Sequence, residues 1–231
     1  MSLVEHLTEL RRRIIIATIA VVLGGVVAFL LYERILDFLI GPYEEITGRT
    51  TLLITDPLEG FTTRLKIAGF GGLFLASPIV LWQVWRFITP GLHKNEKRYA
   101  IPFIAASILL FLGGATLAML TFENALRFLI AVGGEDLEAF FTPSKYLSLI
   151  VLMMVAFGIA FEFPVLLVFL QLARVLTSRR LRGWRRPALV LIVVVAALIT
   201  PSQDPYSLFA MVVPMYLFYE AAILIGRLLK R

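Results

Sequence analysis

The sequence predicts an all-α integral membrane protein with six transmembrane helices, and three observations support that fold class. Of the 231 residues, 59% are hydrophobic and 16% are charged, whereas soluble domains are about half apolar and about a quarter charged. The mean hydropathy is +0.88. The apolar residues also lie in long runs, with basic and acidic segments alternating between them. Runs of this length are typical of membrane-spanning helices.

Six apolar runs mark the expected spans in chain order. A hydrocarbon core about 30 Å thick requires about 20 helical residues. The first three runs and the last are close to that length, the fourth is longer and the fifth is shorter. The expected spans cover about residues 14–31, 67–85, 100–122, 146–173, 187–199 and 207–225.

The fourth and fifth runs depart from the simple pattern. Glu162 and Pro164 interrupt the fourth run, and Pro164 frees the carbonyl four residues earlier, so a kink is expected there. The fifth run has only 13 residues, about 20 Å of helix. It can cross only where the bilayer is thinned, unless it is a re-entrant segment. We expect short fifth and sixth helices at this end of the chain.

The charges between the runs predict the orientation. With the N-terminus in the cytoplasm, six crossings place 16 of the 22 Lys and Arg on the cytoplasmic side and 11 of the 16 Asp and Glu outside. Basic residues are enriched in cytoplasmic segments. Without a fifth crossing the basic C-terminus would lie outside, so we expect both termini in the cytoplasm.

Two external segments have amphipathic patterns. The stretch YERILDFLIGPYEEI at 32–46 predicts a surface helix that ends at Gly41-Pro42. The stretch ENALRFLIAV at 123–132 predicts a second one, broken by the GGED that follows.

Glu162 is the most unusual polar residue, because it lies near the middle of the fourth run. A carboxylate at that depth is costly and faces a cavity or a polar partner. It is a candidate proton site or contact for a partner helix, and a hydrogen-bonded Glu that only supports packing is the alternative. For Glu220, nearer the end of the last run, an Arg partner or snorkelling suffices.

Glu5, Glu9 and Glu96 are the only acids in the expected cytoplasmic segments. A local ion pair would explain each of them, such as Glu9 with Arg12 or Arg13 at helical spacing. The alternative is a carboxylate that receives an arginine from another protein, since guanidinium pairs with carboxylate through two parallel hydrogen bonds.

The sequence offers no pattern typical of an enzyme, a metal site or a cofactor site. Cysteine is absent and there are only two histidines, which excludes thiolate chemistry and argues against a histidine metal site. Zinc-protease, nucleophile-elbow and Walker motifs are missing. The net charge is +6, and most of the basic residues lie in the expected cytoplasmic segments, where they orient the protein in the membrane. No nucleic-acid partner is therefore expected.

Four motifs together resemble the TatC family, the multispanning receptor subunit of the twin-arginine protein translocase. They are HLTELRRR at 6–13, SPIVLWQVWRFITPGLHKNEKR at 77–98, FGIAFEFPV at 157–165, and LITPSQDPYS with VPMYLFYE near the end. The resemblance extends over nearly the whole chain and implies a single domain over residues 1–231.

The resemblance implies a function in protein transport across the cytoplasmic (inner) membrane. Members of the family bind twin-arginine signal peptides of folded precursors at the cytoplasmic face. They work with TatA- and TatB-like single-span proteins in a larger complex, which includes copies of the same chain, and use the proton-motive force.

The resemblance also implies roles for individual residues. Glu9 and Glu96 match the acids that contact the arginines of the signal peptide, and Phe87, Pro90 and Arg11 match positions of the same cytoplasmic site. Glu162 matches the intramembrane acid in contact with partner helices. Pro42 matches a proline of the first external loop, and Asp204 is the nearest counterpart of the acid in the last one.

Two other classes of function stay open at this point. A proton-coupled secondary transporter would use Glu162 as its coupling site, and a membrane scaffold would carry no recognition site for cargo.

Overall fold

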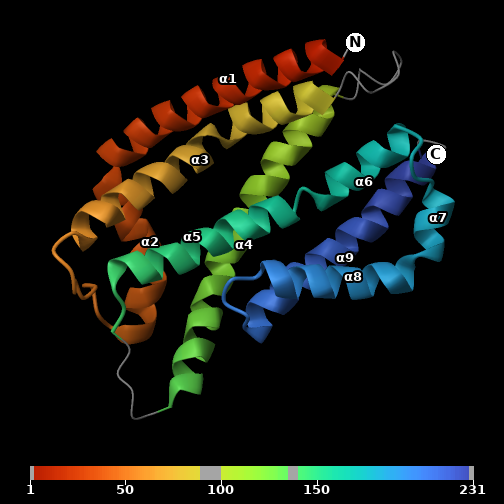
Figure 1. Ribbon diagram of the computed structural model, residues 1–231. Helices are drawn as coiled ribbons and strands as arrows, with labels where there is room; N and C mark the ends of the chain where they lie inside the picture. Colours follow the sequence, from red (N-terminus) through yellow and green to blue (C-terminus); the bar gives the residue numbers. More distant parts are fainter. Residues whose placement is uncertain (1–2, 89–99, 135–139, 229–231) are drawn as a thin grey trace. The chain divides into compact units, whose positions relative to one another are not determined.

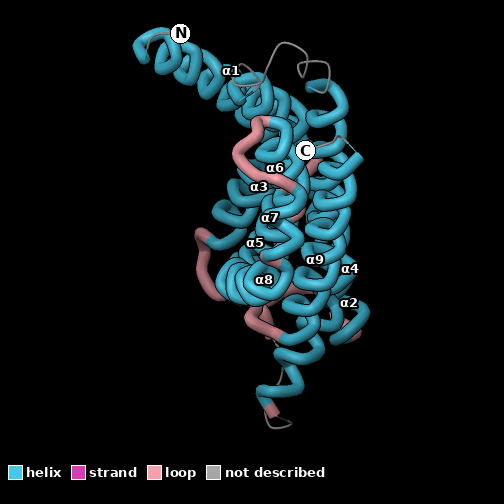
Figure 2. Tube along the Cα trace, turned by 90° about the vertical axis from the view of Figure 1, so that its right-hand side faces the viewer, coloured by secondary structure: helices cyan, strands magenta, loops and turns pink. Residues whose placement is uncertain are grey.

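The computed structural model describes residues 3–88, 100–134 and 140–228, and every regular element in those ranges is a helix (Figure 2). This confirms the all-α prediction. The helices are labelled in Figure 1 and have the following bounds: α1 Leu3–Leu30, α2 Tyr32–Thr47, α3 Glu59–Ile88, α4 Ala100–Gly133, α5 Pro143–Ala160, α6 Phe163–Leu172, α7 Ser178–Gly183, α8 Arg185–Ile199 and α9 Pro205–Leu228.

Five segments of the described chain are long and apolar enough to cross a membrane. They are formed by α1, α3, α4, the pair α5 and α6, and α9. Each coincides with one of the expected runs. The fifth run forms α8, which has 15 residues and a length of about 22 Å, below that of a full span.

The prediction of a short sixth helix was wrong, because α9 has 24 residues. Its N-terminus is extended by Asp204, whose carboxylate Oδ1 accepts a hydrogen bond from the Ser207 N–H at 2.8 Å, and by Pro205 in the first turn. Both are favoured at helix starts. A prediction from apolar runs alone leaves such capping residues out, and the predicted helix was therefore too short.

The described residues form two compact units. The first contains residues 3–88, 100–104 and 140–148, and the second contains residues 105–134 and 149–228.

In the first unit α1 and α3 lie side by side along much of their length (Figure 1). Glycines allow the two backbones to approach closely. A Cβ atom on Gly72 would lie 2.6 Å from both Gly25 N and Val21 O, and one on Gly24 would lie 2.8 Å from Gly72 O. Small residues at a helix crossing permit this packing in membranes.

Helix α2 does not end at Gly41-Pro42 as predicted. It continues to Thr47 and ends at Gly48, which has φ of 65° and donates its N–H to the Glu44 carbonyl. Tertiary packing overrides the proline, because Leu39, Ile40 and Tyr43 are buried and the Tyr146 hydroxyl donates to the Leu39 carbonyl at 2.8 Å. That contact holds the turn before Pro42 in place.

In the second unit the stretch ENALRFLIAV is not a separate amphipathic helix. It is the last part of α4, which has 34 residues. Arg127 pairs with Glu123 four residues earlier at 2.7 Å, which supports helix through this region. The helix ends only at Gly133, and Gly134 follows with φ of 90°. The helix therefore ends where the break was expected, but the stretch before the break belongs to α4 and is not a separate surface helix.

The predicted kink in the fourth span is confirmed. Helix α5 ends at Ala160 and α6 begins at Phe163. At the junction the Glu162 N–H bonds to the Ile159 carbonyl, three residues back, and the regular spacing resumes from Leu166 N to Glu162 O. Pro164 in the first turn of α6 accounts for this break, since it has no N–H to donate.

A buried polar group joins α6, α7 and α9. Gln171 is fully buried; its Nε2 donates to the Ala222 carbonyl at 2.9 Å, and its Oε1 accepts from Ser178 Oγ at 2.9 Å. The Tyr219 hydroxyl donates to the Leu181 carbonyl at 2.6 Å. These bonds hold α7 against α9.

Candidate functional site

The first candidate site begins with Glu9, on the first turns of α1. Its Oε1 accepts a hydrogen bond from Arg13 Nη2 at 2.8 Å, and the exposed fractions of the Glu9 and Arg13 side chains are only 19% and 15%. The spacing of four residues on one helix places the two groups together. Of the two pairings expected for Glu9, the structure contains the one with Arg13.

Helix α3 completes this polar cluster. Arg13 Nη1 donates to Gln83 Oε1 at 3.0 Å, and Gln83 is buried. One turn further along α3, the ring of Phe87 stacks on His6 with centroids 4.4 Å apart. The paired ends of α1 and α3 therefore bring Glu9 and Phe87, two of the sequence-predicted residues, to one place.

The arrangement is suited to binding a guanidinium group. Glu9 already holds one arginine through Oε1, while Oε2 is buried and accepts no hydrogen bond from the described part of the chain. A carboxylate with restricted access to water binds a cation more strongly than an exposed one. The stacked His6 and Phe87 rings supply an apolar wall beside it.

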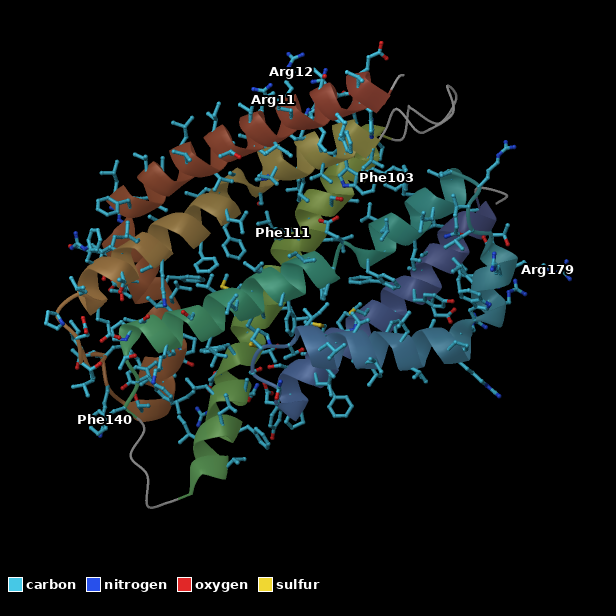
Figure 3. The ribbon with its side chains drawn as sticks, in the orientation of Figure 1. Arg11, Arg12, Phe103, Phe111, Phe140 and Arg179 are labelled. Atoms are coloured by element: carbon cyan, nitrogen blue, oxygen red, sulfur yellow. The ribbon has the colours of Figure 1, made fainter. Side chains whose placement is uncertain are left out.

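The other predicted members of this site are placed differently. Arg11 and Arg12 are exposed and project from the side of α1 opposite α3 (Figure 3). Arg11 therefore does not join the cluster around Glu9. Pro90 and Glu96 lie outside the described residues.

The second candidate site surrounds Glu162, in the second unit. Ser107 Oγ on α4 donates to Glu162 Oε2 at 2.7 Å. Glu162 Oε1 is buried and has no hydrogen-bond partner among the residues that the structure describes. Close packing of α4 on α5 brings the groups together, since a Cβ on Gly114 would lie 2.6 Å from the Phe157 carbonyl oxygen.

The two residues predicted for the external loops are both buried in the fold. Asp204 is 1% exposed and caps α9; its carboxylate accepts from the Ser207 N–H and from the Ser202 hydroxyl. Pro42 is buried inside α2. Neither residue is presented on an open loop.

Comparisons with known proteins decide the family. A family model described as Sec-independent protein translocase protein (TatC) matches residues 5–214. The chain belongs to the TatC family. It is therefore a multi-pass membrane protein and a component of a Sec-independent protein translocase.

Relatives and solved structures agree with this assignment. The chain is 41% identical to the TatC protein of Frankia casuarinae, over 100% of this chain and 67% of the relative. It is 38% identical to that of Aquifex aeolicus, over 100% and 97%.

Two crystal structures described as twin arginine translocase receptor TatC also match this fold. The one in DDM has a TM-score of 0.80 and 37% identity, covering 96% of this chain and 99% of its own. The other has a TM-score of 0.79 and 38% identity, covering 98% and 100%.

Sequence reasoning missed two polar residues of the two TatC candidate sites. Gln83 and Ser107 are uncharged and lie within apolar runs, and only their contacts with Arg13 and Glu162 distinguish them. Arg13 was expected as one of two possible partners of Glu9, without a contact to α3. The signal available for Gln83 was a lone amide inside an otherwise apolar span, since such residues seek a partner.

The structural interpretation of Glu220 is supported. Arg185 Nη2 donates to Glu220 Oε2 at 2.5 Å. The pair joins the start of α8 to α9.

Proposed function

We propose that this TatC-family chain is the receptor subunit that binds twin-arginine signal peptides of folded precursor proteins at the cytoplasmic face. The observation that carries the proposal is the half-buried Glu9 carboxylate, which already holds a guanidinium from Arg13 and faces the Phe87 end of α3. An incoming arginine would bind the second oxygen of Glu9 or displace Arg13. Glu96 and Pro90 complete the proposed site, and Arg11, on the opposite side of α1, lies outside it.

The proposed topology has six crossings of the cytoplasmic (inner) membrane with both termini in the cytoplasm. Five crossings correspond to the long apolar segments, and α8 is the sixth. Its basic N-terminal side and the basic end of α9 support this topology. The short α8 requires a locally thinned bilayer.

We further propose that the chain organises TatA- and TatB-like single-span partners in a larger complex, driven by the proton-motive force. Glu162 supports this role, because its buried Oε1, which has no partner among the described residues, offers a contact to a helix within the membrane. The relatives described above are named translocase proteins, which gives no support to a small-molecule transporter.

The receptor proposal predicts that Glu9→Gln weakens binding of an Arg-Arg signal peptide about 10- to 100-fold, because one charge-assisted hydrogen bond contributes about 1.5–3 kcal/mol. Binding would be measured by fluorescence anisotropy of a labelled peptide with the purified chain in detergent. A Lys-Lys peptide should bind wild type weakly, since ammonium cannot form the bidentate contact.

The matched control is Glu5→Gln, which removes the same charge from an exposed position one turn earlier on α1. This variant should bind the Arg-Arg peptide as wild type does. Equal weakening in both variants would indicate general electrostatic attraction, and unchanged binding in Glu9→Gln would reject the site.

For Glu162 we predict that Glu162→Ala reduces co-purification of a single-span partner several-fold and leaves peptide binding unchanged. Alanine removes the carboxylate that Ser107 contacts, whereas Glu162→Gln keeps a hydrogen-bonding group there and should retain more of the partner. Partner yield after detergent extraction is the measurement. Equal yields from Glu162→Ala and wild type would contradict the contact.

A further inference from the structure

An apolar cavity lies among α6, α7, α8 and α9, in the second unit. Its volume is about 510 Å³. The wall includes Leu167, Leu181, Leu191, Ile192 and Met215. The Tyr219 hydroxyl is also at the wall but donates to the Leu181 carbonyl, so the cavity offers hydrocarbon to an occupant and few polar contacts.

Arginines surround one side of this cavity. Residues 174–186 contain six of them, and the sequence has no acidic residue between 163 and 203. Glu220 pairs with Arg185. The others are exposed: Arg174, Arg179, Arg180, Arg182 and Arg186. Figure 3 shows Arg179 projecting from α7 away from α9.

Trp184 connects the two features. It lines the cavity, and the Arg180 guanidinium lies over its ring at 5.0 Å from the centroid. A tryptophan between an apolar surface and a cluster of arginines is typical of the interface between hydrocarbon and headgroups. The apolar cavity and the positive charge therefore meet at one residue.

The volume favours a lipid chain over a protein helix. A helix about 10–12 Å across occupies roughly 500 Å³ per turn, so the cavity would hold about one turn of a partner whose span needs five or six. An acyl chain needs no hydrogen bonds and suits walls of Leu, Ile and Met. The short α8 also creates a mismatch that bound lipid would relieve.

We propose that this cavity and the arginines of α7 and α8 form a binding site for an anionic phospholipid. One acyl chain occupies the cavity beside Trp184, and the phosphate lies against Arg180 and Arg186. Basic residues beside a groove between membrane helices bind anionic headgroups in this way. The site is distinct from the clusters around Glu9 and Glu162.

Trp184 serves as the reporter in the test. The chain has three tryptophans, so a Trp82→Phe/Trp85→Phe background leaves only Trp184. This full-length chain is placed in phosphatidylcholine vesicles containing a minor fraction of brominated phosphatidylglycerol, or the same fraction of brominated phosphatidylcholine. We expect quenching by the anionic lipid at a fraction at least about fivefold lower, because each of the two arginines adds roughly that factor of attraction to an anionic headgroup.

Three variants separate headgroup from chain binding. Arg180→Gln/Arg186→Gln should abolish the preference for the anionic lipid, while the matched Arg11→Gln/Arg12→Gln on α1 should keep it. Ala188→Phe, which fills the cavity, should reduce quenching by both lipids. Melting temperature by circular dichroism verifies that each variant is folded.

Several outcomes would overturn the proposal. Equal quenching by the two brominated lipids would show that Trp184 contacts ordinary surrounding lipid and that there is no site selective for the anionic headgroup. A preference that survives Arg180→Gln/Arg186→Gln would remove the headgroup site. Inorganic phosphate that alters Trp184 emission in detergent as strongly as the lipid does would indicate a free-anion site. No quenching by either lipid would show that no lipid chain occupies the cavity.

Discussion

Gly72→Ala is expected to destabilise the first unit by about 2–3 kcal/mol, because overpacking at a rigid contact costs about that much. The added Cβ would lie 2.6 Å from the backbone of α1 at Gly25 and Val21, and a backbone cannot rotate aside as a side chain can. Helix α1 must therefore move away from α3. Thermal unfolding in detergent, followed by circular dichroism, measures the loss.

The same substitution is expected to weaken binding of an Arg-Arg peptide more than tenfold. The hydrogen bond from Arg13 to Gln83 and the stack of His6 on Phe87 both depend on the α1–α3 contact. Separation of the helices would take the Glu9 carboxylate away from Phe87.

Gly69→Ala is the matched control on the same helix. A Cβ at Gly69 meets nothing within 4 Å, so this variant should be neutral or gain up to about 1 kcal/mol from helix propensity. Equal stability of the two variants would show that α1 and α3 are not in close contact at Gly72.

Gly226→Ala is expected to destabilise the second unit by about 3 kcal/mol. The new Cβ would take the space of Gln171 Oε1 and Ser178 Oγ. Gln171 would then lose its bonds to Ser178 and to the Ala222 carbonyl. Each buried polar group left without a partner costs about 1–3 kcal/mol, which is why a single methyl group has so large an effect.

A double-mutant cycle tests the cause of that loss. Once Gln171→Ala has removed the amide, adding Gly226→Ala should cost little, because the two effects share one contact. Gly183→Ala, where a Cβ meets nothing within 4 Å, controls for the substitution itself. Additive losses for Gln171 and Gly226 would rule out the proposed clash.

Apolar patterning predicted where the apolar helices lie, five of them long enough to cross a membrane, because a lipid environment places the same demand on every residue of a crossing helix. The runs correspond to α1, α3, α4, the α5–α6 pair, α8 and α9. The break near Pro164 was also predictable, since a missing N–H acts locally.

The errors arose where tertiary contacts or caps compete with local signals. Helix α2 passes through Gly41-Pro42 because Tyr146, distant in sequence, packs on it. The ENALRFLIAV stretch continues α4 because nothing in it stops a helix before Gly133. Turn residues raise the probability of a helix end, but packing decides whether it occurs.

The sequence by itself determined that this is a multispanning membrane protein of the TatC family and pointed to Glu9 and Glu162 as its unusual acids. Only the tertiary structure decided which groups meet those acids. Arg13 and Gln83 are 70 residues apart and Ser107 and Glu162 are 55 apart, separations that no helical period encodes. Close glycine contacts between helices bring them together, and those contacts exist only in the folded chain.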